Sequence, residues 1–161
     1  MRRHANQGLT QGVCTAFLVE QTWHRGRLHN YYNAFYFRVG PDRWHRIQVD
    51  CRGLAWRAVA APDRKAHPLP AGFEVRTVDL GEELGVVGLE VDRIEYREEF
   101  RDTWDSDGDP FRDEAELSIH FWGERALQIR YYADDTTLHL AHGAARREWR
   151  PHESSAAEWA G

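Results

Sequence analysis

The chain has 161 residues, a length that suits one domain with a core of its own. Hydrophobic residues make up 42% and charged residues 29%, which argues against a disordered chain and against a membrane protein. The formal net charge of −5 gives no overall attraction to nucleic acid or anionic lipid, so such binding would need a local patch. We therefore expect a single domain over residues 1–161.

The first residues, Met1-Arg2-Arg3, are followed by polar residues rather than an apolar run, so we expect no secretory signal. No stretch approaches the roughly 18 apolar residues of a membrane span. Two cysteines, Cys14 and Cys51, are too few for a disulfide framework and fit buried thiols in a reducing compartment. These features predict a cytoplasmic protein without a membrane partner.

Strand patterns dominate the first half of the chain. Residues 13–20 read as a long strand that leads into a polar stretch at 23–33. Between residues 34 and 59 apolar and polar side chains alternate, and turn residues at 40–43 and 51–53 divide this stretch into three strands. The pattern predicts an antiparallel meander.

A segment at 61–86 connects this meander to the second half. Its first part is rich in proline, and residues 73–78 read as one more strand. Residues 79–84 could form one helical turn with Asp79 as N-cap, although Gly81 and Gly85 limit it. Helix is therefore expected to be confined to one or two short segments.

The second half repeats the strand pattern. A long strand at 91–100 and a polar stretch at 101–114 precede a meander at 116–140, in which Leu117, Ile119 and Phe121 share one face. The tail at 143–161 is polar and rich in alanine, and a short strand near 148–150 or a helical end are both open.

The two meanders have the same spacing between matching positions. The separation of Val39 and Ile47 equals that of Phe121 and Ile129, which suggests an internal duplication with units at 12–60 and 87–142. Chance similarity of two hairpins is equally open, because alternation is common to half-buried sheets. The fold class predicted is all-β, mainly antiparallel meanders, forming a sandwich or barrel of about eight strands.

One acidic stretch resembles an EF-hand calcium loop over twelve residues, 103–114. Aligning Gly108 with the loop glycine places four acidic residues at ligand positions: Asp105, Asp107, Asp109 and Glu114. The stretch departs from the pattern at Thr103 and Pro110, and its flanks read as strands rather than helices. A solvated hairpin tip is therefore the favoured interpretation, with calcium binding as the alternative.

No arrangement of residues predicts catalysis, and no cofactor is expected. Cys14 lies in an apolar strand, Cys51 lies next to an aspartate, and no serine has the sequence context of an activated nucleophile. His139 and His142 fall on opposite faces of a strand, which disfavours a shared metal ion. The sequence therefore favours a protein without catalytic activity, with an enzyme left open as an alternative.

Aromatic and arginine side chains alternate on the outward face of the first meander. We take this set as the candidate binding surface: Tyr36, Arg38, Trp44, Arg46 and Arg57. Such a face could anchor a protein partner or stack nucleobases, and it could equally be Arg and aromatic pairing that covers the sheet.

Three functions remain open on this basis. The leading prediction is a protein-binding module of bacteria or phages, of the immunity, inhibitor or adaptor type. The alternative is a small-ligand-binding protein or enzyme with a pocket inside the β-domain, with candidate residues His120, Arg130, Tyr132 and His139 on the second meander or His45 and Asp50 on the first. The third is a single-stranded nucleic-acid binder using the candidate binding surface, which the acidic balance disfavours.

Overall fold

A computed structural model describes residues 2–5, 11–50, 53–62, 69–104, 110–132 and 135–150, with side chains described over a narrower set within them. The described residues form eleven strands and no helix, which confirms the all-β prediction. The strands are β1 (Arg2–Ala5), β2 (Gly12–His24), β3 (Arg27–Val39), β4 (Arg43–Asp50), β5 (Gly53–Val59), β6 (Phe73–Asp79), β7 (Glu90–Trp104), β8 (Pro110–Phe121), β9 (Arg125–Tyr132), β10 (Asp135–His142) and β11 (Ala145–Trp149).

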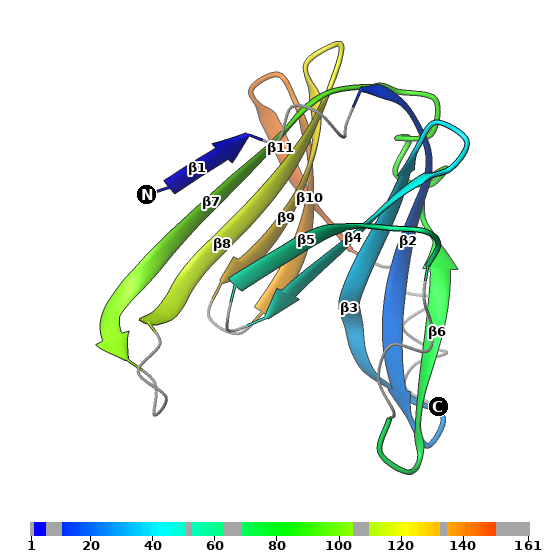
Figure 1. Cartoon of the computed structure of the whole chain (residues 1–161), viewed down its shortest axis with the longest axis vertical. Helices are drawn as coiled ribbons and strands as arrows, with labels where there is room; N and C mark the ends of the chain where they lie inside the picture. The colour runs from blue at the N-terminus through cyan, green and yellow to red at the C-terminus, as the bar shows by residue number, and fades with distance from the viewer. Residues whose placement is uncertain are drawn as a thin grey trace.

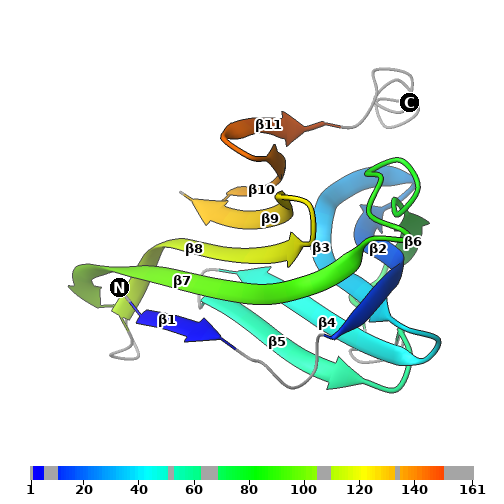
Figure 2. The same cartoon turned by 90° about the horizontal axis from the view of Figure 1, so that it is seen from above.

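All strand pairs are antiparallel and follow one path, in the order β11-β10-β9-β8-β7-β2-β3-β4-β5, with β1 added to β7 and β6 added to β2. The sheet is strongly curved. The strands β4 and β5 at one end of the path fold over the other half of the sheet, so that β5 contacts β8 and β4 contacts β9 (Figures 1 and 2). Among the described strands the path does not close, which agrees with the sandwich alternative rather than the barrel.

The core lies inside this fold and draws on both halves of the chain. Phe17, Phe35 and Phe37 from β2 and β3 belong to the same cluster of buried side chains as Leu117 and Ile119 from β8. These side chains occupy alternate positions along their strands, which is why the period-two pattern in the sequence located them. Burial of apolar surface at about 25 cal/mol per Å² is the main force that holds the two halves together.

Two sets of four strands have matching registers. We name β2–β5 unit 1 and β7–β10 unit 2. The β3–β4 hairpin pairs Phe35 with Ile47, and the β8–β9 hairpin pairs Leu117 with Ile129 at the equivalent place. The β4–β5 and β9–β10 hairpins also match.

The first hairpin of each unit carries a register shift at the same position. It lies between Cys14 and Ala16 in unit 1 and between Val91 and Arg93 in unit 2. The units meet where β2 pairs with β7, and Val13 pairs there with Glu90, its own equivalent. The two units are therefore related by an approximate two-fold axis through this pair.

The segment between β6 and β7 forms turns rather than a helix. The carboxylate of Asp79 accepts a hydrogen bond from the Gly81 N–H at 2.9 Å, and the Leu84 N–H donates to the Leu80 carbonyl at 2.9 Å. The chain does not continue into a helix beyond this hydrogen bond, in agreement with the low helix propensity of the glycines at 81 and 85. No helix in the described ranges is long and apolar enough to cross a membrane.

Candidate functional site

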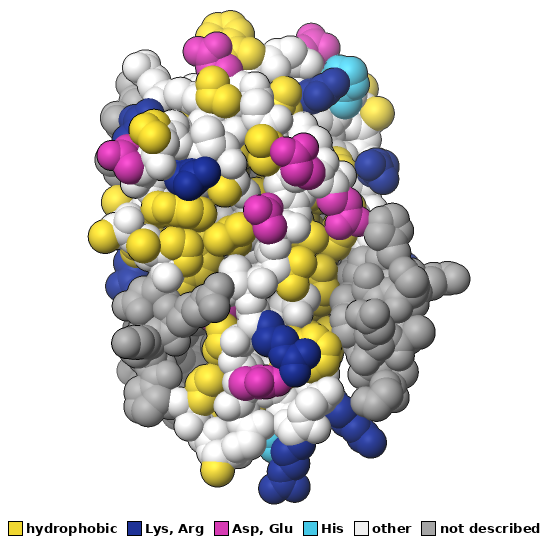
Figure 3. Space-filling view, turned by 90° about the vertical axis from the view of Figure 1, so that its right-hand side faces the viewer, with side chains coloured by type: hydrophobic (Ala, Val, Ile, Leu, Met, Phe, Trp, Pro, Cys, Tyr) yellow, Lys and Arg dark blue, Asp and Glu magenta, His cyan; other side chains and the backbone are white. Residues whose placement is uncertain are grey.

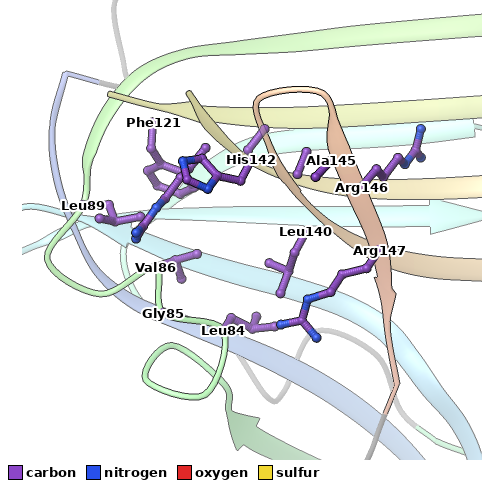
Figure 4. A pocket seen from close by; sticks show the side chains of 13 residues that line it. Leu84, Gly85, Val86, Leu89, Phe121, Leu140, His142, Ala145, Arg146 and Arg147 are labelled. Atoms are coloured by element: carbon purple, nitrogen blue, oxygen red, sulfur yellow. The ribbon is translucent and has the colours of Figure 1, made fainter. Parts of the chain in front are cut away.

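A pocket of about 330 Å³ opens at one end of unit 2, and we name it the end pocket. The segment at 84–89 forms one side, and the β10–β11 hairpin forms the other (Figure 4). Its floor is apolar and consists of Leu84, Val86, Leu89, Phe121 and Leu140. The floor therefore continues the hydrophobic core to the surface.

Four basic side chains line the pocket: Arg125, His142, Arg146 and Arg147. Arg146 lies 3.7 Å from the carboxylate of Glu116, and the other three surround the apolar floor. Arg125 pairs across strands with Phe121 and His142, and Arg147 pairs with Leu140, so all three share the face of the sheet that carries the core. Figure 4 shows His142 and Arg147 reaching over the pocket, with Arg147 extending in the direction of Leu84.

In the part of the chain that the structure describes, none of these three side chains forms an ion pair or a hydrogen bond with another residue. A guanidinium group carries five N–H donors and a permanent positive charge, and two such groups here have no partner among the described residues. An anion with an apolar body would complement both the rim and the floor of the end pocket.

The candidate binding surface predicted from the sequence is brought together on one face of β3, β4 and β5. Cross-strand pairs join Tyr36 to Arg46, Arg38 to Trp44, and Arg46 to Arg57. Tyr36 and Arg46 are only 1% and 8% exposed, whereas Arg57 is exposed and the other two are half-buried. The guanidinium of Arg38 lies 5.2 Å from the Trp44 ring centroid, so the Arg and aromatic pairing is observed.

Tyr36 is buried because it belongs to a polar network with Glu20 of β2. The Tyr36 hydroxyl donates to Glu20 Oε2 at 3.1 Å and accepts from Arg46 Nε at 3.1 Å, and Asn33 Nδ2 donates to Glu20 Oε1. Glu20 is itself 6% exposed. Such a network stabilises the sheet when all of its polar groups are satisfied, and it leaves the Tyr36 ring unavailable for stacking.

The residues that the sequence suggested for a small-ligand site on unit 2 lie only partly in one cavity. Arg130, Tyr132 and His139 line a second cavity of about 320 Å³, together with Thr137, whose hydroxyl lies 2.9 Å from His139 Nε2. Burial and the positive charges of Arg146 and Arg130 lower the pKa of His139. His120 lies outside this cavity, with its Nε2 3.2 Å from a carboxylate oxygen of Glu95.

A buried carboxylate, Glu116, holds the outer face of unit 2 together. It is 5% exposed and lies 3.1 Å from Arg97, 3.2 Å from Arg130 and 3.7 Å from Arg146. The sequence analysis did not single out Glu116, because its partners come from three other strands. These ion pairs account for Arg146 pointing away from the end pocket in Figure 4.

His45 and Cys14 are core residues. The His45 ring stacks on Phe37 at a centroid distance of 4.5 Å and accepts a hydrogen bond from Trp56 Nε1 at 3.2 Å. Burial raises the pKa of the Cys14 thiol to about 11, so very little reactive thiolate exists at neutral pH. The side chain of Asp50, like Cys51, lies outside the part that the structure describes.

The calcium hypothesis stays a prediction. Asp105, Asp107 and Asp109 lie outside the described residues, and Glu114 falls on β8 with its side chain also outside them. The stretch is flanked by β7 and β8, which agrees with the strands expected on both sides. Among the described residues, no three His, Cys, Asp or Glu side chains are placed to share a metal ion.

The end pocket was missed from the sequence because its residues are scattered. Leu84, Leu89, Arg125 and Arg147 come from segments that become neighbours only in the folded sheet. A usable signal was present at Arg146 and Arg147, where two arginines follow a glycine turn and only the second lies on the apolar face.

Comparisons with protein-family models, with curated proteins and with solved structures find no match to this chain.

Proposed function

We propose that this chain is a binding domain for a small amphipathic anion, a molecule with an apolar body and one acidic head group, held in the end pocket. The observation that carries the proposal is the placement of Arg125, His142 and Arg147, which have no partner among the described residues, around an apolar floor. This develops the small-ligand alternative expected from the sequence.

The size and lining of the end pocket fit such a ligand. Ligand sites have volumes of about 300 to 1,000 Å³ and combine apolar walls with a few polar groups that orient the ligand. The end pocket, at about 330 Å³, is at the small end of this range. Each methylene of a ligand buried on the floor would contribute about 0.8 kcal/mol.

The basic rim supports a preference for acidic head groups. Hydrogen bonds from a guanidinium to a carboxylate or phosphate are charge-assisted and contribute about 1.5 to 3 kcal/mol. Arg125 and Arg147 are exposed, and neither forms an ion pair with a residue in the described ranges that would have to be broken before it binds a ligand. A neutral ligand of the same shape would lack this contribution.

Isothermal titration calorimetry with octanoate, octanol and octylamine tests the proposal. We expect octanoate to bind at least about tenfold more tightly than octanol, and octylamine to bind most weakly. Replacing Arg147 by Ala should remove most of the preference for octanoate over octanol. The control is Arg27→Ala, an exposed residue at the tip of the β2–β3 hairpin that does not line the end pocket, and it should leave the preference unchanged. Equal affinity for octanoate and octanol would refute the proposal.

Protein binding remains a second candidate, because Arg57 is exposed and Arg38 and Trp44 are half-buried on the same face. Arginine and tryptophan are frequent anchors in protein interfaces. A pull-down from the source organism with a Trp44→Ala, Arg57→Ala control would support this candidate if a specific partner were lost. The expectation of a cytoplasmic protein of bacteria or phages stays a prediction.

Single-stranded nucleic-acid binding receives less support. Of the two aromatic side chains in the candidate binding surface, Tyr36 is buried and Trp44 is covered by Arg38. On the face seen in Figure 3, acidic and basic side chains are interspersed and apolar ones gather across the middle, without a patch of one sign among the coloured residues. Binding to the phosphate backbone would need such a patch.

We also propose that the two units arose by internal duplication. The support is the shared register of three consecutive hairpins and the shared register shift at Cys14 and Val91. Alternating sequence patterns recur by chance, but they do not dictate a bulge at the same place in two hairpins.

A further inference from the structure

Unit 2 carries another cleft, of about 580 Å³, which we name the Trp122 cleft. The lining includes polar side chains, the Trp122 indole and residues shared with the end pocket: Asp92, Arg93, His120, Phe121, Trp122, Glu124, Arg125, Ala126, Gln128 and Ala141, with the glycines at 123 and 143. Trp122 is 65% exposed, the largest exposure among the large apolar side chains that the structure describes. An exposed indole offers a large, flat and apolar surface with one N–H donor to a ligand in the cleft.

The backbone, rather than core packing, holds Trp122 at the edge of this cleft. Its N–H donates to the Glu90 carbonyl at 3.0 Å, and the next two residues, Gly123 and Glu124, both have positive φ, 89° and 62°. A glutamate in this conformation is disfavoured and must be held by its surroundings. The tight turn thus presents the indole at a fixed place beside the cleft.

The polar side chains of the Trp122 cleft are already oriented. Arg93 is held by Asp92 at 2.6 Å and by Glu95 at 3.0 Å, and His120 lies 3.2 Å from Glu95. The side-chain oxygen of Gln128 is buried and has no hydrogen-bond partner among the described residues. A buried acceptor without a partner is unfavourable, and a hydroxyl group of a ligand that donates to it would remove this cost.

The charges of this cleft balance, in contrast to the rim of the end pocket. Arg93 and Arg125 stand against Asp92 and Glu124, so the lining favours neither a cation nor an anion. The ligand that fits is neutral, rich in hydroxyl groups that both donate and accept, and flat and apolar on one side. We propose that the Trp122 cleft binds a neutral saccharide, with one sugar face stacked on the Trp122 indole and a hydroxyl group donating to Gln128.

The Trp122 cleft adjoins the end pocket, and Arg125 lines both. Trp122 and Gln128 line the cleft alone, and Gln128 lies on the face of the sheet opposite to Leu127 of the core. The two contacts proposed for the saccharide therefore do not depend on the anion proposed for the end pocket. The two sites are also expected to differ in their response to salt, because only binding of an anion is screened by ions.

The test is a glycan array with the full chain, followed by calorimetry and tryptophan fluorescence on the neutral oligosaccharides that bind. We expect micromolar to millimolar binding that changes little with salt. Trp122→Ala should weaken it at least about tenfold, Gln128→Ala should weaken it less, and Arg27→Ala should have no effect. Circular dichroism and thermal unfolding will confirm that the variants are folded.

Three results would overturn the saccharide proposal: no binding to any neutral glycan on the array, binding restricted to acidic or phosphorylated glycans, and unchanged affinity in a folded Trp122→Ala variant. Octanoate titrated into the same Trp122→Ala preparation separates this failure from that of the end pocket. Octanoate binding should persist there whatever the outcome with saccharides.

Discussion

Units 1 and 2 have the same pattern of strand pairing, but three equivalent residues at one corner of each unit are packed differently. In unit 1 this corner consists of Gly12, Val39 and Arg43, and in unit 2 of Leu89, Phe121 and Arg125. Arg43 donates a hydrogen bond from Nη2 to the carbonyl of Gln11, so the chain itself occupies this arginine. Arg125 has no such partner in the described part of the chain and lies at the end pocket.

The residue at position 12 of unit 1, equivalent to Leu89 of unit 2, explains the difference. Gly12 has φ +138°, and a Cβ there would lie 2.9 Å from Arg43 Nη2 and 3.0 Å from Val39 Cγ1, so only glycine lets the chain pass this close. At the equivalent place Leu89 and Phe121 supply two large side chains that line a cavity instead. The same hydrogen-bonded framework therefore gives a closed corner in unit 1 and a pocket in unit 2, because a few side chains differ.

The largest expected effect tests whether the units share one core. Phe37→Ala in unit 1 should lower the free energy of unfolding by about 3 to 5 kcal/mol, and Ile119→Ala at the equivalent position by about 2 to 5 kcal/mol, because both side chains are fully buried. Urea unfolding followed by fluorescence and circular dichroism should show a single transition in each variant. Two separate transitions would mean that the units fold independently.

The second prediction compares alanine variants of the two equivalent arginines, Arg125 and Arg43. Arg125→Ala should weaken octanoate binding about tenfold or more with little change in stability, since this side chain forms no ion pair or hydrogen bond with the part of the chain that the structure describes. Arg43→Ala should leave octanoate affinity unchanged and lower the melting temperature, because it removes the hydrogen bond to Gln11. Calorimetry and thermal unfolding measure the two quantities, and equal loss of affinity in both variants would contradict the assignment.

A smaller effect is expected at the closed corner. Gly12→Ala should lower the free energy of unfolding by about 1 to 3 kcal/mol, because the new methyl group meets Arg43 and Val39 and the positive φ disfavours an L-residue. Gly85→Ala is the control, since its φ is also positive but a Cβ there meets nothing within 4 Å. Similar losses in the two variants would show that backbone conformation alone matters, without crowding.

The smallest predicted effect concerns pH. Burial and two nearby arginines lower the pKa of His139 below its ordinary value near 6.5, so the unfolded chain binds a proton there more readily than the folded chain. This group therefore lowers stability as the pH falls through and below 6.5, and has no effect well above it. His139→Gln should flatten this part of the stability profile, and an unchanged acid slope in chemical denaturation would argue against it.

Much of the fold could be predicted from local patterns. Alternation located Leu117, Ile119 and Phe121 on the inner face, and all three are buried. The equal spacing of Val39 to Ile47 and Phe121 to Ile129 reflects matching registers, because hairpin loops of equal length set equal pairing. These features depend only on neighbours in the chain.

The sites could not be predicted in the same way, because they depend on which strands become neighbours. Tyr36 reads as an outward residue, but the pairing of β2 with β3 brings Glu20 to its hydroxyl and buries it. The end pocket needs Leu89 beside Phe121 and Arg147 beside Leu140, and no local pattern records these contacts. Long-range pairing, rather than side-chain type, decided both outcomes.

The most direct test of the account is a titration of ¹⁵N-labelled protein with octanoate, followed by amide chemical shifts. The account predicts saturable shifts at residues 84–89, 121–126 and 140–147, and none at the equivalent residues 39–44 and 58–60 of unit 1. Shifts at both sets, or at neither, would contradict the claim that one corner of this framework is closed by its own chain while the other is open to a ligand.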